Sequence, residues 1–277
     1  MNWWCSAQGL PWTWKWQPYP GVWLFVGVIA LLYWKLGRGS EDSSDSYAQS
    51  RPKFFLVGLL LLWAAIDWPI GPLGAGYLAS VHQLQFVLLV VWAPPFLIIG
   101  VAPDAWRRLV FAPLVKPLAQ FVTKPLVAFG IYNFLVIGTH FPDLVDGLMV
   151  SQLGSFGFDL LWIAAGFGLW WPVISPVPEM NGLSYPQRFG YMFGSVILAA
   201  APALFLIYSK YPLYELYELA PPVTMMPAKS DQLLGGLIMK IGSTVAVVTA
   251  TTIIFFRWHR AEAHGDTERE MKLPTLS

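Results

Sequence analysis

The chain has 277 residues, of which 56% are hydrophobic and 12% are charged, and its formal net charge is +1. Soluble domains carry about 25% charged residues, so this composition excludes an ordinary soluble domain and indicates a membrane protein whose solvent is largely lipid. The low net charge excludes a basic surface for nucleic acid. The single cysteine, Cys5, excludes an intrachain disulfide and a thiolate cluster.

Seven apolar segments of membrane-spanning length follow a tryptophan-rich stretch, residues 1–19. Because the bilayer core offers the backbone no water, such segments must be helical. We therefore predict an all-α membrane protein with a Trp-rich outer interfacial segment (1–19), a seven-helix transmembrane domain (20–256) and a cytoplasmic tail (257–277). The seven predicted helices are Pro20–Leu36, Lys53–Ile70, Tyr77–Gly100, Thr123–Thr139, Ser155–Ile174, Phe189–Tyr208 and Leu233–Phe256.

The distribution of basic residues predicts the orientation of these helices. Thirteen of the 17 Lys and Arg residues fall between the first and second helices, the third and fourth, the fifth and sixth, or after the seventh. Only Lys15, Lys210 and Lys229 fall on the other side, and Lys240 lies within the seventh helix. Because Lys and Arg accumulate in cytoplasmic connections, the N-terminus is predicted outside and the C-terminus in the cytoplasm.

Polar residues inside the predicted helices gather in their outer halves. At 1.5 Å per residue, His82 lies about 8 Å below the outer end of the third helix, and Gln85 lies one turn deeper on the same face. Ionisable groups in hydrocarbon cost several kcal/mol unless they are paired or hydrated, so this clustering predicts an outward-facing polar cavity. The predicted members are Asp67, His82, Gln85, Asn133, His140, Asp159, Asp231, Gln232 and Lys240.

These residues have structural as well as functional interpretations. His82 and His140 can be buried histidines that bond to neighbouring helices, or ligands of a metal ion. Asp159 and Lys240 can form a buried ion pair that fixes the arrangement of two helices. Catalytic motifs such as G-x-S-x-G, H-E-x-x-H or a Walker loop do not occur in the right context, so the sequence supports no enzyme activity.

Four blocks of the sequence, in this order, resemble a known family. They are "HQLQFVLLVVWAPPFLIIG", "THFPDLVDGLM", "GFGLWWPVISPVP" and "KSDQLLGGLIMKIG", and together they resemble the multi-spanning CtaG-type family of cytochrome c oxidase assembly factors. The resemblance covers nearly the whole chain. It implies a multi-pass protein of the bacterial inner membrane that helps to build a haem–copper oxidase, with oxidase subunits as partners and copper as a candidate cofactor.

The resemblance also assigns individual positions. The family pattern H-x-x-Q-H before A-P-P places its first histidine on His82 and its glutamine on Gln85. His140 matches the histidine before the P-x-L-x-D stretch. Asp231 and Gln232 match the D-Q pair that opens the last helix.

Several positions depart from the family pattern. The second histidine of H-x-x-Q-H is Phe86, and the H-x-x-E-H pattern before W-W-P falls on Ser155, Phe158 and Asp159. Lys240 stands where the family has an apolar or aromatic residue. Since neutral imidazole is a principal copper donor and a cation repels a metal ion, these changes weigh against metal binding.

Two main functional hypotheses follow. In the first, the protein is an oxidase assembly factor that aids copper-centre formation from the outer side, with His82, His140 and Asp159 as the remaining donors. In the second, it is a metal-free accessory subunit of an oxidase or another respiratory complex, and an Asp159–Lys240 pair fills the polar cavity. A transporter is a weaker alternative, because no pair of broken helices related by an internal repeat is present.

Overall fold

A computed structural model describes residues 2–37 and 46–272, and the side chains of residues 2–36 and 50–263. It is all-helical, and no strand occurs in this part of the chain. The prediction of an all-α protein is therefore confirmed. In chain order the helices are α1 (Pro20–Leu32), η1 (Tyr33–Gly37), α2 (Ser46–Ile66), α3 (Ile70–Gly76), α4 (Ala79–Phe86), η2 (Val87–Trp92), α5 (Ala93–Gly100), α6 (Pro103–Val110), α7 (Lys116–Val122), α8 (Pro125–Gly138), α9 (Pro142–Leu148), α10 (Gln152–Ile174), α11 (Tyr185–Tyr208), α12 (Glu215–Glu218) and α13 (Ala228–Lys272).

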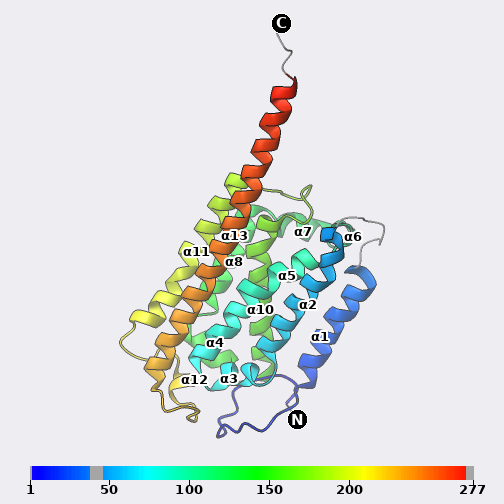
Figure 1. Ribbon diagram of the computed structural model, residues 1–277. Helices are drawn as coiled ribbons and strands as arrows, with labels where there is room; N and C mark the ends of the chain where they lie inside the picture. Colours follow the sequence, from blue (N-terminus) through cyan, green and yellow to red (C-terminus); the bar gives the residue numbers. More distant parts are fainter. Residues whose placement is uncertain (1, 38–45, 273–277) are drawn as a thin grey trace.

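The long helices form a bundle whose two ends are built from different short elements (Figure 1). The N-terminal segment, α3 and α12 lie at one end, which we call the N-terminal end. α6 and α7 lie at the opposite end, from which α13 projects beyond the bundle, and we call this the C-terminal end. α13 continues without a break past the predicted boundary at residue 257 to Lys272, and residues 273–277 lie outside the described part.

Several helices have the length and apolar composition of membrane spans. Four qualify alone: the continuous run Ala79–Gly100, then α10, α11 and the Ala228–Ala263 part of α13. The pairs α2–α3 and α7–α8 are bent by 46° and 77°, and each pair adds one span if it crosses as a unit. The segment Pro20–Leu36 is a shorter apolar helix. These lengths are consistent with a bilayer core of about 30 Å.

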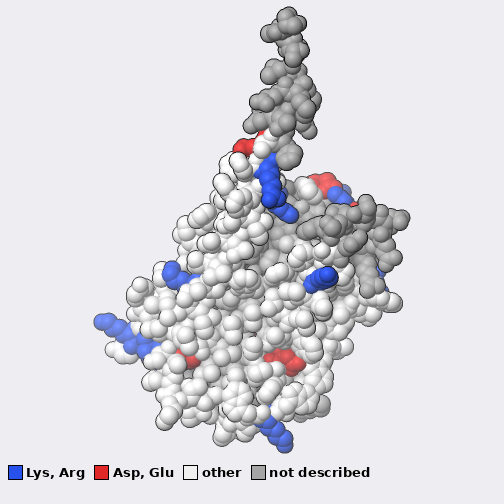
Figure 2. Space-filling view, in the orientation of Figure 1, with Lys and Arg blue, Asp and Glu red and all other residues white. Residues whose placement is uncertain are grey.

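The outer surface of the bundle suits lipid. Large apolar side chains are exposed along the helices, among them Leu126, Phe134 and Phe205. Figure 2 shows that charged side chains are few and scattered over the face in view. A contiguous apolar surface of this kind is a liability in water and the expected exterior in a membrane.

The run Ala79–Gly100 changes its hydrogen-bond pattern in the middle for a local reason. Pro94 and Pro95 have no N–H, so the carbonyls of Val90 and Val91 lose their normal helical donors. The chain responds with the π-helical turns of η2, in which the Ala93 N–H bonds to the carbonyl of Leu88, five residues back. The resulting bulge lies against α10 at Gly166, where a Cβ would come within 2.7 Å of the Val90 carbonyl oxygen.

The N-terminal segment is not uniformly interfacial. Trp14 and Trp16 are exposed, as predicted for a membrane interface, but Trp4 and Cys5 are buried with 1% and 2% of their surface exposed. Trp4 packs edge-on against Phe25 and Phe156. The start of the chain therefore closes the N-terminal end of the bundle.

Candidate functional site

The polar residues predicted to share a cavity lie mostly at the N-terminal end, around α4. His82 of α4 is completely buried, and neither of its ring nitrogens makes a hydrogen bond of normal geometry, although the Gly74 carbonyl lies close enough to interact with the ring. Its ring instead faces aromatic rings: Trp162 at 4.8 Å, Tyr217 at 5.6 Å and Phe158 at 5.9 Å between centroids. A buried imidazole without such a hydrogen bond is uncommon, because unsatisfied polar groups cost free energy.

His140 follows α8 and is fully engaged. Its Nδ1 lies 2.6 Å from the Val136 carbonyl oxygen, and its Nε2 lies 3.0 Å from the side-chain amide of Gln83. A carbonyl only accepts, so Nδ1 carries the proton and Nε2 of the neutral ring is an acceptor; the Gln83 amide, whose Oε1 lies 3.0 Å from Nε2, must therefore be turned so that its NH₂ donates to the ring. This amide orientation, assigned from the network, also supplies a partner to the otherwise unpaired Gln83 nitrogen.

Asp159 of α10 is bonded to the N-terminal segment. Its carboxylate accepts a hydrogen bond of 2.8 Å from the Trp4 indole N–H, and only 5% of the residue is exposed. Lys240 is exposed on α13, and no ion pair joins the two described side chains. The predicted Asp159–Lys240 ion pair is therefore wrong. Its place is taken by a neutral donor from a segment that sequence reasoning had assigned to the membrane interface.

The thiol beside Trp4 is protected by the same arrangement. Cys5 donates to the Ile66 carbonyl at 3.2 Å. Burial raises the pKa of the Cys5 thiol well above its usual value, and the negative charges of Asp159 and Asp67 raise it further. The thiol is therefore held in its protonated, unreactive form.

Asp231 and Gln232, the D-Q pair at the start of α13, form hydrogen bonds with the backbone of neighbouring segments. Asp231 accepts from both the hydroxyl and the backbone N–H of Ser80, one of the N–H groups that the first turn of α4 leaves without a helical partner. Gln232 accepts from the Leu213 N–H at 2.6 Å and donates to the Leu206 carbonyl at 3.1 Å. Both side chains tie α13 to the elements around it.

The other predicted members also bind locally. Gln85 donates to the Ala65 carbonyl of α2 at 2.9 Å, and Asn133 donates to Phe129 of its own helix at 2.9 Å. Asp67 accepts from the indoles of Trp63 and Trp23 at 2.7 and 3.0 Å. None of these contacts links the residue to His82 or His140.

Aromatic side chains occupy the space between the two histidines. Phe86, where the resemblance places a second histidine, packs edge-on against His140 at 4.9 Å and Trp162 at 5.5 Å. Tyr214 and Tyr217, from the α12 region, donate to the backbone carbonyls of His140 and Gly74. Sequence reasoning singled out the Phe86 position but missed Trp162, Tyr214 and Tyr217, because aromatic residues in apolar segments give no signal that separates them from lipid-facing ones.

The geometry does not suit a resident copper ion. Among the described residues, no three His, Cys, Asp or Glu side chains lie close enough together to hold a metal. Nε2 of His140 is bonded to Gln83 and Oδ2 of Asp159 to Trp4, and His82 is the histidine of the cluster whose ring nitrogens lack a hydrogen bond of normal geometry. Copper sites in proteins draw on several nitrogen or sulfur donors. The cluster is a hydrogen-bonded and aromatic junction of α4, α8, α10 and the N-terminal segment.

Comparison with known proteins identifies a family that matches most of the chain. A sequence model of the family described as cytochrome c oxidase caa3 assembly factor (Caa3_CtaG) matches residues 27–261. That range runs from within α1 into α13 and contains every predicted site residue. No curated protein and no solved structure matches the chain.

Proposed function

We propose that this chain, which belongs to the family of cytochrome c oxidase caa3 assembly factors, serves oxidase assembly by binding oxidase components within the membrane. The observation that carries the proposal is the extent of the family match, which takes in nearly all of the bundle. The role is one of binding, since the family is defined by assembly and not by a reaction. The lipid-facing surface of the bundle supports a partner that is itself embedded in the bilayer.

We further propose a seven-span topology in a bacterial inner membrane, with the N-terminal end outside. The four long helices, the two bent pairs and the short helix Pro20–Leu36 supply seven crossings. Thirteen of 17 basic residues then lie on the cytoplasmic side, as the positive-inside rule favours. A membrane-impermeant maleimide applied to intact spheroplasts should label Lys210→Cys and spare Arg108→Cys. The reverse pattern would refute the orientation.

Copper-centre formation stays a prediction from the resemblance, and the site gives it little support. The three candidate donors do not converge, and two of them are committed to other partners. We therefore favour an assembly role in which the polar cluster fixes the shape of the N-terminal end. A resident metal ion is not part of this role.

One experiment tests both the binding of oxidase components and the proposed lack of a resident copper ion. The full chain is purified in mild detergent from cells that make the oxidase, and the co-purifying proteins and bound copper are measured on the same sample. We expect oxidase subunits in partly assembled form, with copper well below one ion per chain. The matched variants are His82→Ala with His140→Ala, and His259→Ala, an exposed histidine on α13 outside the cluster.

The outcomes separate the hypotheses. One copper per chain that is lost in the His82→Ala, His140→Ala variant but kept in His259→Ala would establish the copper hypothesis and refute the metal-free role. Stoichiometric association with complete, active oxidase would establish the accessory-subunit alternative. The absence of any oxidase subunit would refute the assembly proposal for this chain.

A further inference from the structure

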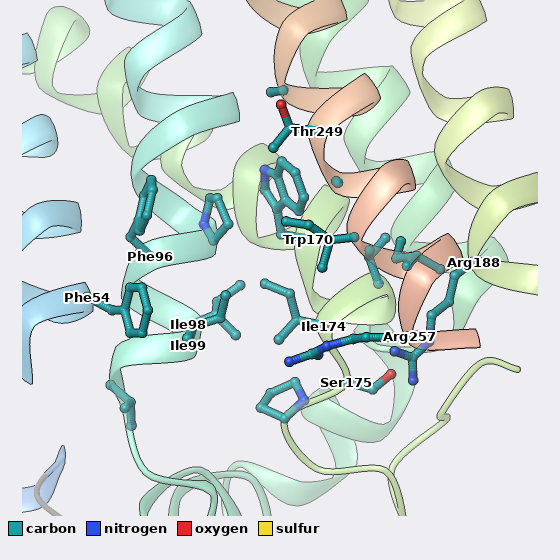
Figure 3. Close-up of a pocket in the computed structure, with 18 of the residues that line it drawn as sticks. Phe54, Phe96, Ile98, Ile99, Trp170, Ile174, Ser175, Arg188, Thr249 and Arg257 are labelled. Atoms are coloured by element: carbon teal, nitrogen blue, oxygen red, sulfur yellow. The ribbon is translucent and has the colours of Figure 1, made fainter. Parts of the chain in front are cut away.

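A cavity of about 590 Å³ lies toward the C-terminal end of the bundle, away from the polar cluster. α2, α5, α10, α11 and α13 contribute to its wall, and most of the lining is apolar (Figure 3). Phe54, Phe96 and Ile99 form one side, and Trp170 of α10 also lines the cavity. Its volume falls within the range of roughly 300–1,000 Å³ typical of sites for small molecules and cofactors.

The charge around this cavity has one sign. Among the residues that the structure describes, four arginines line it and no acidic residue does; the four are Arg51, Arg107, Arg188 and Arg257. Arg107 is compensated by Asp104 and Glu179, with ion-pair distances of 2.9 and 2.7 Å. Arg188 and Arg257 have no carboxylate partner among the described residues.

Two of these arginines form the polar end of the cavity. Arg188 of α11 and Arg257 of α13 reach toward Ser175 from neighbouring helices (Figure 3). Their positive charges are close enough to repel each other. Arg188 is held in place by the Leu183 carbonyl, which accepts from its Nε at 3.0 Å, and by the ring of Tyr185 at 5.4 Å. Like charges gathered without a counter-ion favour an anionic ligand.

We propose that this cavity binds a phospholipid with an anionic head group. The phosphate lies between Arg188 and Arg257, and an acyl chain lies along the wall of Phe54, Phe96 and Trp170. Basic pockets between transmembrane helices on the cytoplasmic side are a known mode of anionic lipid recognition. The site uses no residue of the N-terminal cluster and so does not depend on the oxidase-assembly proposal, while its cytoplasmic location rests on the proposed orientation.

The combination of features favours a lipid over a free anion. A free phosphate needs only the arginines, and it would leave the apolar walls and most of the volume without a ligand. A neutral lipid needs only the walls, and it would leave the guanidinium groups of Arg188 and Arg257 facing each other without a counter-charge. An anionic lipid satisfies both parts of the cavity at once.

The test is a lipid titration of the full chain in mild detergent, read by native mass spectrometry. Phosphatidylglycerol and phosphatidylcholine with identical acyl chains give two dissociation constants, and their ratio is the anionic preference. The variant Arg188→Gln with Arg257→Gln should lower this preference by about 30-fold, from roughly fivefold for each basic side chain at a membrane surface. Ala250→Phe, which narrows the apolar part, should weaken both lipids and leave the ratio unchanged.

The matched control is Arg108→Gln with Arg260→Gln, which removes two arginines outside the cavity lining. It should keep the wild-type preference, and all variants should elute as wild type on size exclusion. The proposal is overturned if phosphatidylcholine binds as tightly as phosphatidylglycerol, or if the Arg188→Gln, Arg257→Gln variant keeps the preference. It is also overturned if Ala250→Phe leaves binding unchanged, or if millimolar inorganic phosphate displaces the lipid, which would assign the arginines to a free anion.

Discussion

The two ends of the helix bundle treat their polar residues in different ways. At the N-terminal end, Asp159, His140 and Asp231 are buried and hydrogen-bonded to other parts of the same chain. At the C-terminal end, arginines from four elements border a cavity of about 590 Å³. At the N-terminal end, polar side chains join helices of the same chain through hydrogen bonds. At the C-terminal end, positively charged side chains surround a cavity.

This difference shows that polar residues within a membrane do not mark a ligand site by themselves. A buried polar group costs free energy unless it has a partner, and the chain can supply that partner as well as a ligand can. At the N-terminal end the Trp4 indole and the Gln83 amide do so. Arg188 and Arg257 have no acidic partner in the described chain, and this lack of compensation distinguishes their site.

The largest effect on the N-terminal end is expected from removing Trp4, the hydrogen-bond donor to Asp159. Trp4→Ala deletes a buried indole and leaves the carboxylate without its donor, so we expect a loss of about 3–5 kcal/mol in the free energy of unfolding. Trp4→Phe keeps an aromatic ring and loses only the N–H, for a cost of about 1–3 kcal/mol. Denaturant titration in detergent micelles measures both. Equal stability of wild type and Trp4→Ala would show that the N-terminal segment does not close the bundle.

Alkylation of Cys5 reports the same closure without a change in sequence. Because the thiol is buried and its pKa is raised, maleimide should react at least about 100-fold more slowly than with the unfolded chain. The thiolate forms only as the pH rises toward the raised pKa, so the rate should keep increasing with pH beyond the range in which a free thiol reaches its plateau. Trp4→Ala should remove most of the protection. Rapid labelling of the folded wild-type protein would contradict the burial of this segment.

Close packing at Gly74 allows a smaller perturbation of the N-terminal end. A Cβ at this position would overlap Gln85 Oε1 and lie 2.6 Å from Gln85 Cδ. Gly74→Ala should therefore displace Gln85 and cost about 1–3 kcal/mol. Gly130→Ala in α8, where a Cβ meets nothing within 4 Å, is the control and should stabilise by up to about 1 kcal/mol. The two effects should differ in sign, and a neutral Gly74→Ala would show that the junction can relax.

The fold was predictable to the extent that it depends on local composition. Each of the seven predicted apolar segments contains a helix, because a run of apolar residues has few alternatives in lipid. The crossing number and the orientation stay predictions. The short helices at the ends of two spans were missed: α3 follows α2 across a bend of 46°, and α7 precedes α8 across a bend of 77°. The π-helical turns of η2, which Pro94 and Pro95 produce, were also missed.

The site was predictable only in part. His82, His140 and Asp159 do lie toward one end, since helix direction and residue depth follow from the sequence. Their partners do not follow, because Trp4 and Asp159 are 155 residues apart and Trp4 resembles the exposed tryptophans around it. Gln83 was not predicted as a member of the cluster, because it lies on a different helix face from His82 and Gln85. That face points toward His140, to which Gln83 bonds.

The smallest predicted effect concerns the hydrogen bond between Gln83 and His140, which tests whether polar groups at the N-terminal end are paired within the chain. A double-mutant cycle with Gln83→Leu, His140→Phe and the double variant isolates the pair, and we expect a coupling of about 0.5–1.5 kcal/mol in the free energy of unfolding. The apolar replacements matter, because an alanine would add a cavity term to each single variant. Tyr214 donates to the backbone carbonyl of His140, so its contact should survive in all four proteins. A coupling near zero would mean that Nε2 of His140 is free in the folded protein, and the N-terminal end would then again offer two histidines to a ligand.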